Sequence, residues 1–214
     1  MSFHLIAKND VHLWFLPNAA PDVDQLCAES LEYLAPGELY RYQSFRSSKR
    51  AKQFLLGRIL MRRSLAAYLP EDSKELRFSY GPNGKPELYS ASADDPVFSL
   101  SHCRDGSVMA IARAERIGVD IEQTIRAPTI LRIARQFYSD AELRQLDSQG
   151  ADAAEGAMAL WLLKESVVKA NGSTVWEGLS GVKLALQGKH VQWLSAPMDG
   201  PESNWFLMCG RYQA

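Results

Sequence analysis

The order of the predicted elements constrains the fold of this 214-residue chain most strongly, because the same order occurs twice. Residues 3–16 alternate between apolar and polar as strands do, and helical segments and then strands follow them. From residue 106 a second series of strands, helices and closing strands begins. The sequence therefore predicts an α+β protein with two halves of similar size, residues 1–104 and 105–214. We find no sequence repeat between them.

Capping and stop signals mark the predicted helices. Ser47 or Ser48 is the candidate N-cap of a long amphipathic helix that Pro70 closes, and the sequence SDAE at residues 139–142 is a capping box. Asn171-Gly172 provides a stop signal for a helix that starts near residue 153. Other helices are expected at residues 21–32, from Pro36 and from Pro128.

Strand patterns fill the remaining segments. Residues 76–88 predict two strands around an Asn83-Gly84 turn, and residues 96–103 predict a strand that ends in a polar turn. Residues 106–123 contain two apolar strands joined by a short polar connection, which we expect to pair antiparallel. Closing strands are expected at residues 182–186, 190–195 and 204–212.

Composition excludes several classes of protein. A formal net charge of −1 argues against a general nucleic-acid or membrane binder. The apolar run Val11–Leu16 is too short to span a bilayer and has no basic leader, so no signal peptide is predicted. Three scattered cysteines suit neither a disulfide scaffold nor a thiolate zinc site. We expect a cytoplasmic protein with free thiols that binds neither nucleic acid nor membrane.

Two carboxylates share one face of the predicted strand IGVDIEQ. The Cα atoms of Asp120 and Glu122 would lie roughly 7 Å apart, because a strand rises ~3.4 Å per residue. Like charges at that distance repel by about 2 kcal/mol at an effective dielectric constant near 20, and by ~0.6 kcal/mol in water. Either this face is solvated and the repulsion is small, or a cation lies between the two carboxylates.

A second candidate site lies in the helix WLLKESVVKANG. Trp161, Glu165 and Lys169 are four residues apart and form one row, within a helix that is apolar on nearly all sides and therefore expected to be buried. The alternative is an exposed Glu–Lys pair that stabilises the helix by only ~0.3 kcal/mol.

Three further patterns could bind anions. Ser101 and His102 end a strand, where side chains can reach a ligand, although a surface histidine is the simpler interpretation. Lys85 follows a glycine turn that differs from a Walker P-loop. A basic segment fits either a local anion site or a solvated helix face; its residues are Lys49, Arg50, Lys52, Arg58, Arg62 and Arg63.

Taken together, these motifs resemble the 4′-phosphopantetheinyl transferases, and most closely the surfactin-synthetase-activator type. The resemblance runs from about Pro36 to Gly181 through the motifs LLGR, GKP, FSLSH, GVDIE, FYSDAE and WLLKESVVKANG. It implies two pseudo-symmetric α/β halves packed together, with the active site in the cleft between them. It also implies a monomer, because such a cleft needs no second subunit. The first half would contact the coenzyme A phosphates, and the second would carry the metal-binding carboxylates and the catalytic helix.

The resemblance also implies a reaction and its residues. Coenzyme A would donate its phosphopantetheine arm to a serine of an apo acyl or peptidyl carrier protein and leave as 3′,5′-ADP. The implied Mg²⁺ ligands are Asp120, Glu122 and Glu165, which supply the oxygen atoms that this ion prefers. Glu165, as a base acting directly or through a water, and Lys169 would be catalytic. The implied coenzyme A contacts are Arg41, Lys85, Ser101, His102 and Lys169.

Two positions depart from that family pattern. Glu38 and Gln53 stand where basic residues are common, and Arg50 or Lys52 could replace the missing charge. Two other functions are compatible with these residues: a non-catalytic module that binds coenzyme A or a carrier protein, and a magnesium-dependent phosphohydrolase.

Overall fold

The structure is a computed structural model that describes residues 5–7, 10–19, 22–89, 92, 94–114, 116–174, 191–197 and 205–212. The first part of the chain forms β1 (Val11–Pro17), α1 (Val23–Glu29), α2 (Pro36–Ser44), α3 (Ser48–Leu65), β2 (Phe78–Tyr80), β3 (Pro86–Leu88), β4 (Val97–His102) and β5 (Gly106–Ala112). The second part forms β6 (Arg116–Gln123), α4 (Ala127–Phe137), α5 (Asp140–Ser148), α6 (Ala153–Asn171), β7 (Val191–Pro197) and β8 (Trp205–Tyr212). Short 3₁₀ turns cover Leu31–Tyr33, Thr124–Arg126 and Gly150–Asp152.

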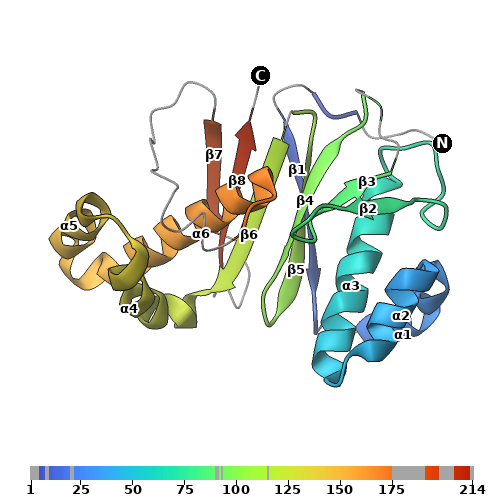
Figure 1. Cartoon of the computed structure of the whole chain (residues 1–214), viewed down its shortest axis with the longest axis horizontal. Helices are drawn as coiled ribbons and strands as arrows, with labels where there is room; N and C mark the ends of the chain where they lie inside the picture. The colour runs from blue at the N-terminus through green and yellow to red at the C-terminus, as the bar shows by residue number, and fades with distance from the viewer. Residues whose placement is uncertain are drawn as a thin grey trace.

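Two antiparallel sheets with the same connectivity form the centre of the molecule (Figure 1). Their strand orders are β1-β5-β4 and β6-β8-β7, so in each sheet the first strand pairs with the last. This confirms the predicted α+β class with two similar halves. The predicted boundary between residues 104 and 105 stays a prediction. In the structure, the last strand of the first sheet is β5 and the first strand of the second sheet is β6, so the chain passes from one sheet to the other in the connection between them.

The predicted antiparallel pairing of the two strands within residues 106–123 is wrong. Both edges of β5 are occupied, one by β1 and the other by β4, so no edge remains for β6. The apolar side chains of β5 and β6 nevertheless share one buried cluster that includes Val108, Ala110, Ile117 and Val119. The two strands are therefore neighbours through side-chain packing between sheets and not through a backbone ladder.

The helix signals of the sequence are largely confirmed. The Ser47 hydroxyl accepts a hydrogen bond from the Arg50 amide at the start of α3, and Ser139 with Glu142 forms the capping box of α5. Gly172 closes α6 in the left-handed conformation with φ +64°, which glycine adopts without steric cost. α3 ends at Leu65, before the predicted limit at Pro70. The predicted strand at 182–186 lies outside the described residues, while β7 and β8 match the other two closing strands.

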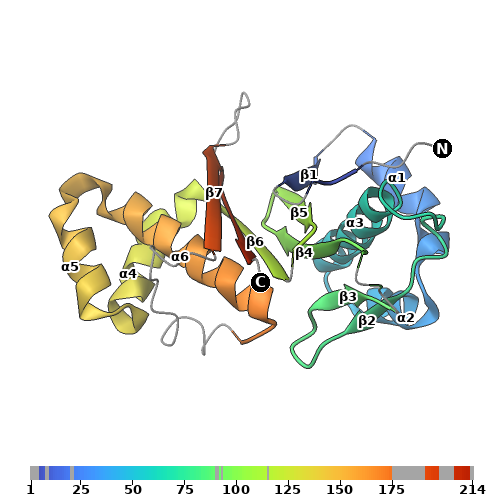
Figure 2. The same ribbon diagram turned by 90° about the horizontal axis from the view of Figure 1, so that it is seen from above.

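α3 covers the first sheet and α6 covers the second, and the two sheets meet at β4 and β6 (Figures 1 and 2). At this junction the Val119 amide donates a 3.1 Å hydrogen bond to the Ser99 hydroxyl oxygen. In the described parts of the chain, every helix is too short or too polar to cross a membrane.

Gly118 allows α6 to pack directly on β6. A Cβ atom at this position would lie 1.8 Å from the Ser166 carbonyl oxygen and 2.7 Å from the Ala170 nitrogen. Both are backbone atoms of α6, which cannot move aside as a flexible side chain could. The absence of a side chain at Gly118 therefore sets the distance between this helix and the strand that carries Asp120 and Glu122.

We predict that Gly118→Ala lowers the free energy of unfolding by about 3 kcal/mol or more, because overpacking against backbone atoms must displace the helix. Urea denaturation measures the change. Gly37→Ala in α2 is the control, since an added Cβ there meets no atom within 4 Å. Equal stability of the two variants would contradict the close packing.

Candidate active site

Three side chains from three elements meet where the two halves join. The Asp120 carboxylate on β6 is 8% exposed, and its Oδ1 accepts hydrogen bonds from Ser101 Oγ at 2.6 Å and from Lys169 Nζ at 2.5 Å. The Lys169 ammonium also donates to Ser101 Oγ at 2.6 Å. The structure thus brings together predicted site residues from β4, β6 and α6, across both halves of the molecule.

Alternation along β6 explains why Asp120 faces this junction. Val119 and Ile121 point into the apolar cluster between the sheets and are 0% and 2% exposed. Their neighbours Asp120 and Glu122 therefore face the other side of the strand. α6 is buried along most of its length, as its composition predicted, and Glu165 is buried with it, while Lys169 and Glu122 are half-buried.

Glu165 is 8% exposed and has a strongly perturbed acidity. Burial and then the negative charges of Asp120 and Glu122 raise the pKa of its carboxyl group to about 7, while Lys169 acts in the opposite direction. Glu165 therefore interacts electrostatically with both strand carboxylates. A carboxylic acid with a pKa near neutrality can accept and release protons under physiological conditions.

Positive side chains of the chain itself hold two of the three carboxylates. Lys169 binds Asp120, and Arg126, one turn beyond β6, pairs with Glu122, whose Oε1 also accepts from the Gln123 amide at 3.0 Å. In the described part of the chain, no three His, Cys, Asp or Glu side chains are grouped closely enough to hold a metal ion. The donor chemistry nevertheless fits a hard divalent cation, because all three residues offer carboxylate oxygens.

His102 is the last residue of β4, next to Ser101, and Gln53 of α3 contacts the residue that follows it. Burial of the imidazole, followed by the charge of Lys169, lowers the pKa of His102 below its usual value. Gln53 Nε2 donates a 2.7 Å hydrogen bond to the Cys103 carbonyl oxygen, which fixes the end of this strand to α3. The side chain of Gln53 thus holds two elements of the fold together. Lys52 and Arg50, the two residues that could supply the positive charge missing at position 53, do not take part in this contact. Lys52 pairs with Asp24, and Arg50 is exposed.

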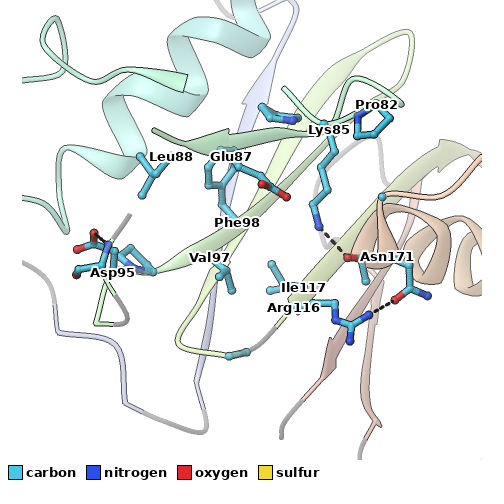
Figure 3. Close-up of a pocket in the computed structure, with 17 residues that line it drawn as sticks. Pro82, Lys85, Glu87, Leu88, Asp95, Val97, Phe98, Arg116, Ile117 and Asn171 are labelled. Carbon is cyan, nitrogen blue, oxygen red and sulfur yellow. Dashed lines mark hydrogen bonds between the residues drawn. The ribbon is translucent and has the colours of Figure 1, made fainter. Parts of the chain in front are cut away.

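The structure places Lys85 and Arg41 apart from the Ser101–Asp120–Lys169 group. Lys85 lines a cavity of about 510 Å³ at the C-terminal end of α6, where its Nζ donates to the Ala170 carbonyl oxygen at 2.8 Å (Figure 3). Burial lowers the pKa of this lysine. Arg41 is exposed at the rim of a second cavity, of about 360 Å³, with its guanidinium 5.7 Å from the Phe54 ring centre.

Glu38 is buried and bound to basic side chains, which the sequence did not predict. Its carboxylate accepts hydrogen bonds from Arg62 at 2.8 Å, from the Tyr80 hydroxyl at 2.8 Å and from the Ala35 amide at 3.0 Å, and it lies 3.3 Å from Arg58 Nε. Burial alone would raise the pKa of Glu38, but these hydrogen bonds outweigh it, so the pKa lies below the usual value. The sequence signal that could have revealed part of this network is the position of Glu38 as the third residue of a helix that begins with proline. A carboxylate at that position can reach back to the N-cap amide.

This network shows that the basic segment is not uniformly a solvated face, while its interpretation as an anion site stays a prediction. Arg58 and Arg62 are 9% and 2% exposed, so this part of α3 is an interior face and not a solvated one. Arg58 lies between two aromatic rings, 4.7 Å from the centre of Phe54 and 5.1 Å from that of Tyr80. Because Glu38 is neutralised by two arginines, it adds no free negative charge to the anion-binding candidates.

Comparison with known proteins matches both parts of the chain to one family. Residues 116–212 match the 4′-phosphopantetheinyl transferase superfamily, and residues 20–115 match the N-terminal region of 4′-phosphopantetheinyl transferases. The two matches meet in the connection between β5 and β6.

Individual relatives agree with this assignment. A Synechocystis sp. protein, whose name assigns it provisionally to the 4′-phosphopantetheinyl transferases, is 32% identical over 197 residues, which are 91% of this chain and 77% of the relative. The 4′-phosphopantetheinyl transferase HetI of Nostoc sp. is 27% identical over 85% of this chain and 76% of its own length. The enzyme Sfp of Bacillus subtilis is 29% identical over 66% of this chain and 62% of its own length. On these matches, the chain belongs to the 4′-phosphopantetheinyl transferase superfamily.

Proposed function

We propose that this protein transfers the 4′-phosphopantetheine group of coenzyme A to a serine hydroxyl of an apo acyl or peptidyl carrier protein and releases 3′,5′-ADP. The observation that carries the proposal is the Ser101–Asp120–Lys169 contact with the buried Glu165 beside it. It places a lysine, a serine and acidic side chains at the junction between the halves. The names of the relatives support the same activity.

In the proposed reaction the carrier serine oxygen attacks the phosphorus atom that bears the pantetheine arm. A new phosphorus–oxygen bond forms to the serine, and the bond from that phosphorus to the oxygen shared with 3′,5′-ADP breaks. Glu165 takes the serine proton, directly or through a water. Lys169 stabilises the charge that develops on the departing phosphate.

The remaining anion-binding residues would hold the donor. We assign Ser101 and His102 to the coenzyme A phosphates, together with Lys169. Lys85 is assigned to the adenosine 3′-phosphate, and Arg41 to a further phosphate contact. Support comes from their positions: Ser101 and His102 end β4 beside Lys169, and Lys85 reaches the end of the same helix that carries Lys169. This division gives residues 1–104 the phosphate contacts and residues 105–214 the carboxylates and the catalytic helix.

Asp120, Glu122 and Glu165 would hold Mg²⁺. All three supply oxygen donors. Burial is the main cause of the raised pKa of Glu165, and a divalent cation would offset the second cause, the repulsion by Asp120 and Glu122. When bound, this ion neutralises charge on the phosphoryl group under attack. We further propose a cytoplasmic monomer that binds neither nucleic acid nor membrane, in keeping with the net charge of −1 and with the site lying within one chain.

One assay separates this function from its alternatives. The protein is incubated with coenzyme A, Mg²⁺ and an apo carrier protein, and the carrier is weighed by mass spectrometry. We expect the mass of one phosphopantetheine group to be added. Release of 3′,5′-ADP without a carrier would indicate a phosphohydrolase instead, and coenzyme A binding without either product would indicate a binding module.

We predict that Asp120→Asn and Glu165→Gln each lower the rate of transfer by about 100-fold or more, because each removes charge that binds the cation or accepts the proton. Excess EDTA should abolish the wild-type rate. Glu155→Gln, an exposed position on the same helix, is the matched control and should keep wild-type activity. Full activity of Asp120→Asn would refute its assignment as a metal ligand.

Stability in EDTA should depend on the protonation of Glu165. Its pKa in the folded protein, about 7, exceeds the ordinary value of 4.5, so folding favours the protonated form. The free energy of unfolding should therefore fall as pH rises from about 4.5 to 7, by up to roughly 3 kcal/mol, and then level off. Urea denaturation across this range measures the effect. Glu165→Gln should remove this part of the pH dependence, and an unchanged profile in that variant would contradict the assignment.

A further inference from the structure

We infer that the turn between β2 and β3 caps the C-terminal end of α6 from the opposite half of the molecule, and that Asn83 thereby positions Lys169. The inference rests on the proposed function only in so far as Lys169 acts in transfer. It makes Asn83 a positioning residue that touches neither donor nor acceptor.

Two side chains of this turn donate to the C-terminal end of α6: Lys85 to a carbonyl group of the last helical turn, and Asn83 to the carbonyl group of Gly172, the residue that closes the helix. Asn83 Nδ2 donates to the Gly172 carbonyl oxygen at 2.8 Å. Lys85 Nζ donates to the Ala170 carbonyl oxygen at 2.8 Å (Figure 3). The final carbonyls of a helix have no partner within the helix. The negative end of the helix dipole also attracts a lysine ammonium. Both contacts cross from the first half of the chain to the second.

The capped turn is the one that carries Lys169. The Gly172 amide donates to the Lys169 carbonyl oxygen at 3.4 Å, and the Ser173 amide donates to the Val168 carbonyl oxygen at 3.0 Å. The Lys169 side chain leaves this same turn to reach Ser101 and Asp120. Fraying of the last turn would therefore shift the Lys169 Cα atom and move the ammonium away from both partners.

The turn that supplies the donors is itself rigid. The Gly84 amide donates to the Gly81 carbonyl oxygen at 2.8 Å, the Gly81 amide donates to the Lys85 carbonyl oxygen at 2.9 Å, and Gly84 adopts φ +79°. Asn83 is therefore presented from a closed loop and not from a mobile segment.

The base of this hairpin is fastened to the helices of the first half. The Tyr80 hydroxyl donates to Glu38 Oε1 at 2.8 Å, and Glu38 is bound in turn by Arg62 of α3. Burial raises the pKa of Tyr80 to about 12, so this hydroxyl stays protonated and remains a donor. The hairpin is thus held at its base by Tyr80 and Glu38, and from its turn Asn83 reaches the residue that closes α6.

Asn83→Asp tests the cap. Aspartate suits a turn as well as asparagine does, but it cannot donate to the Gly172 carbonyl oxygen and it places a negative charge at the negative end of the helix dipole. Because Asn83 is exposed, the variant should fold. Gln25→Glu in α1 is the matched control, since it also converts an exposed amide donor, here bound to Glu29, into a carboxylate.

Hydrogen exchange provides a readout independent of activity. We expect the amides of Gly172 and Ser173 to exchange about tenfold faster in Asn83→Asp than in the wild type, because the last turn opens more often. Gln25→Glu should leave their exchange unchanged. Unchanged exchange in Asn83→Asp would overturn the inference.

Transfer kinetics test the link to Lys169. We expect Asn83→Asp to lower kcat about tenfold, while the KM for coenzyme A changes by less than about twofold, because positioning acts on the chemical step. In a Lys169→Met background the same substitution should cause no further loss, since it acts through Lys169. A rise in KM with unchanged kcat would instead make Asn83 a donor contact, and an equal loss in both backgrounds would exclude action through Lys169.

The two proposals can fail separately. An inactive wild-type protein would refute the proposed transfer, while the exchange measurement would still decide whether the turn caps α6. An active wild-type protein with normal kinetics in Asn83→Asp would refute only the positioning role.

Discussion

The ion pair between Asp120 and Lys169 is the interaction on which the site depends. It joins a strand of the second sheet to the helix that packs on it, and the shared contact with Ser101 adds a strand of the first sheet. The pair is 11% and 29% exposed at its two side chains, so it is screened less than a surface pair would be. It forms only because Gly118 lets α6 lie directly on β6.

The three carboxylates of this group have different environments. Lys169 pairs with Asp120 and Arg126 pairs with Glu122, while burial and then the charges of Asp120 and Glu122 raise the pKa of Glu165 to about 7. A buried acid in that state can serve as a proton acceptor, and the group as a whole attracts further positive charge. Structural ion pairs elsewhere in the chain behave differently, because Glu38 is fully compensated by its arginines and its pKa is lowered.

Much of the fold and part of the site could be predicted from local sequence. Ser139 with Glu142, the Gly172 stop and the buried character of α6 were all confirmed, because capping chemistry and apolar periodicity act within one element. The strand partners of β5 could not be predicted correctly. The local sequence pattern favours pairing with β6 and does not show that β1 and β4 occupy the two edges of β5. Glu38 and its arginines were likewise missed, because their contacts join three separate elements.

Local periodicity in the sequence identifies the residues that are able to carry chemistry. Alternation puts Asp120 and Glu122 on one face of a strand, and helical spacing aligns Glu165 with Lys169. These follow from the fixed periods of strands and helices. Long-range packing, in contrast, is the reason that Ser101 contacts both Asp120 and Lys169, that Lys85 reaches the end of α6, and that Arg58 and Arg62 are interior. Those outcomes depend on how separate elements pack, and packing distances are set by long-range contacts that no local period encodes.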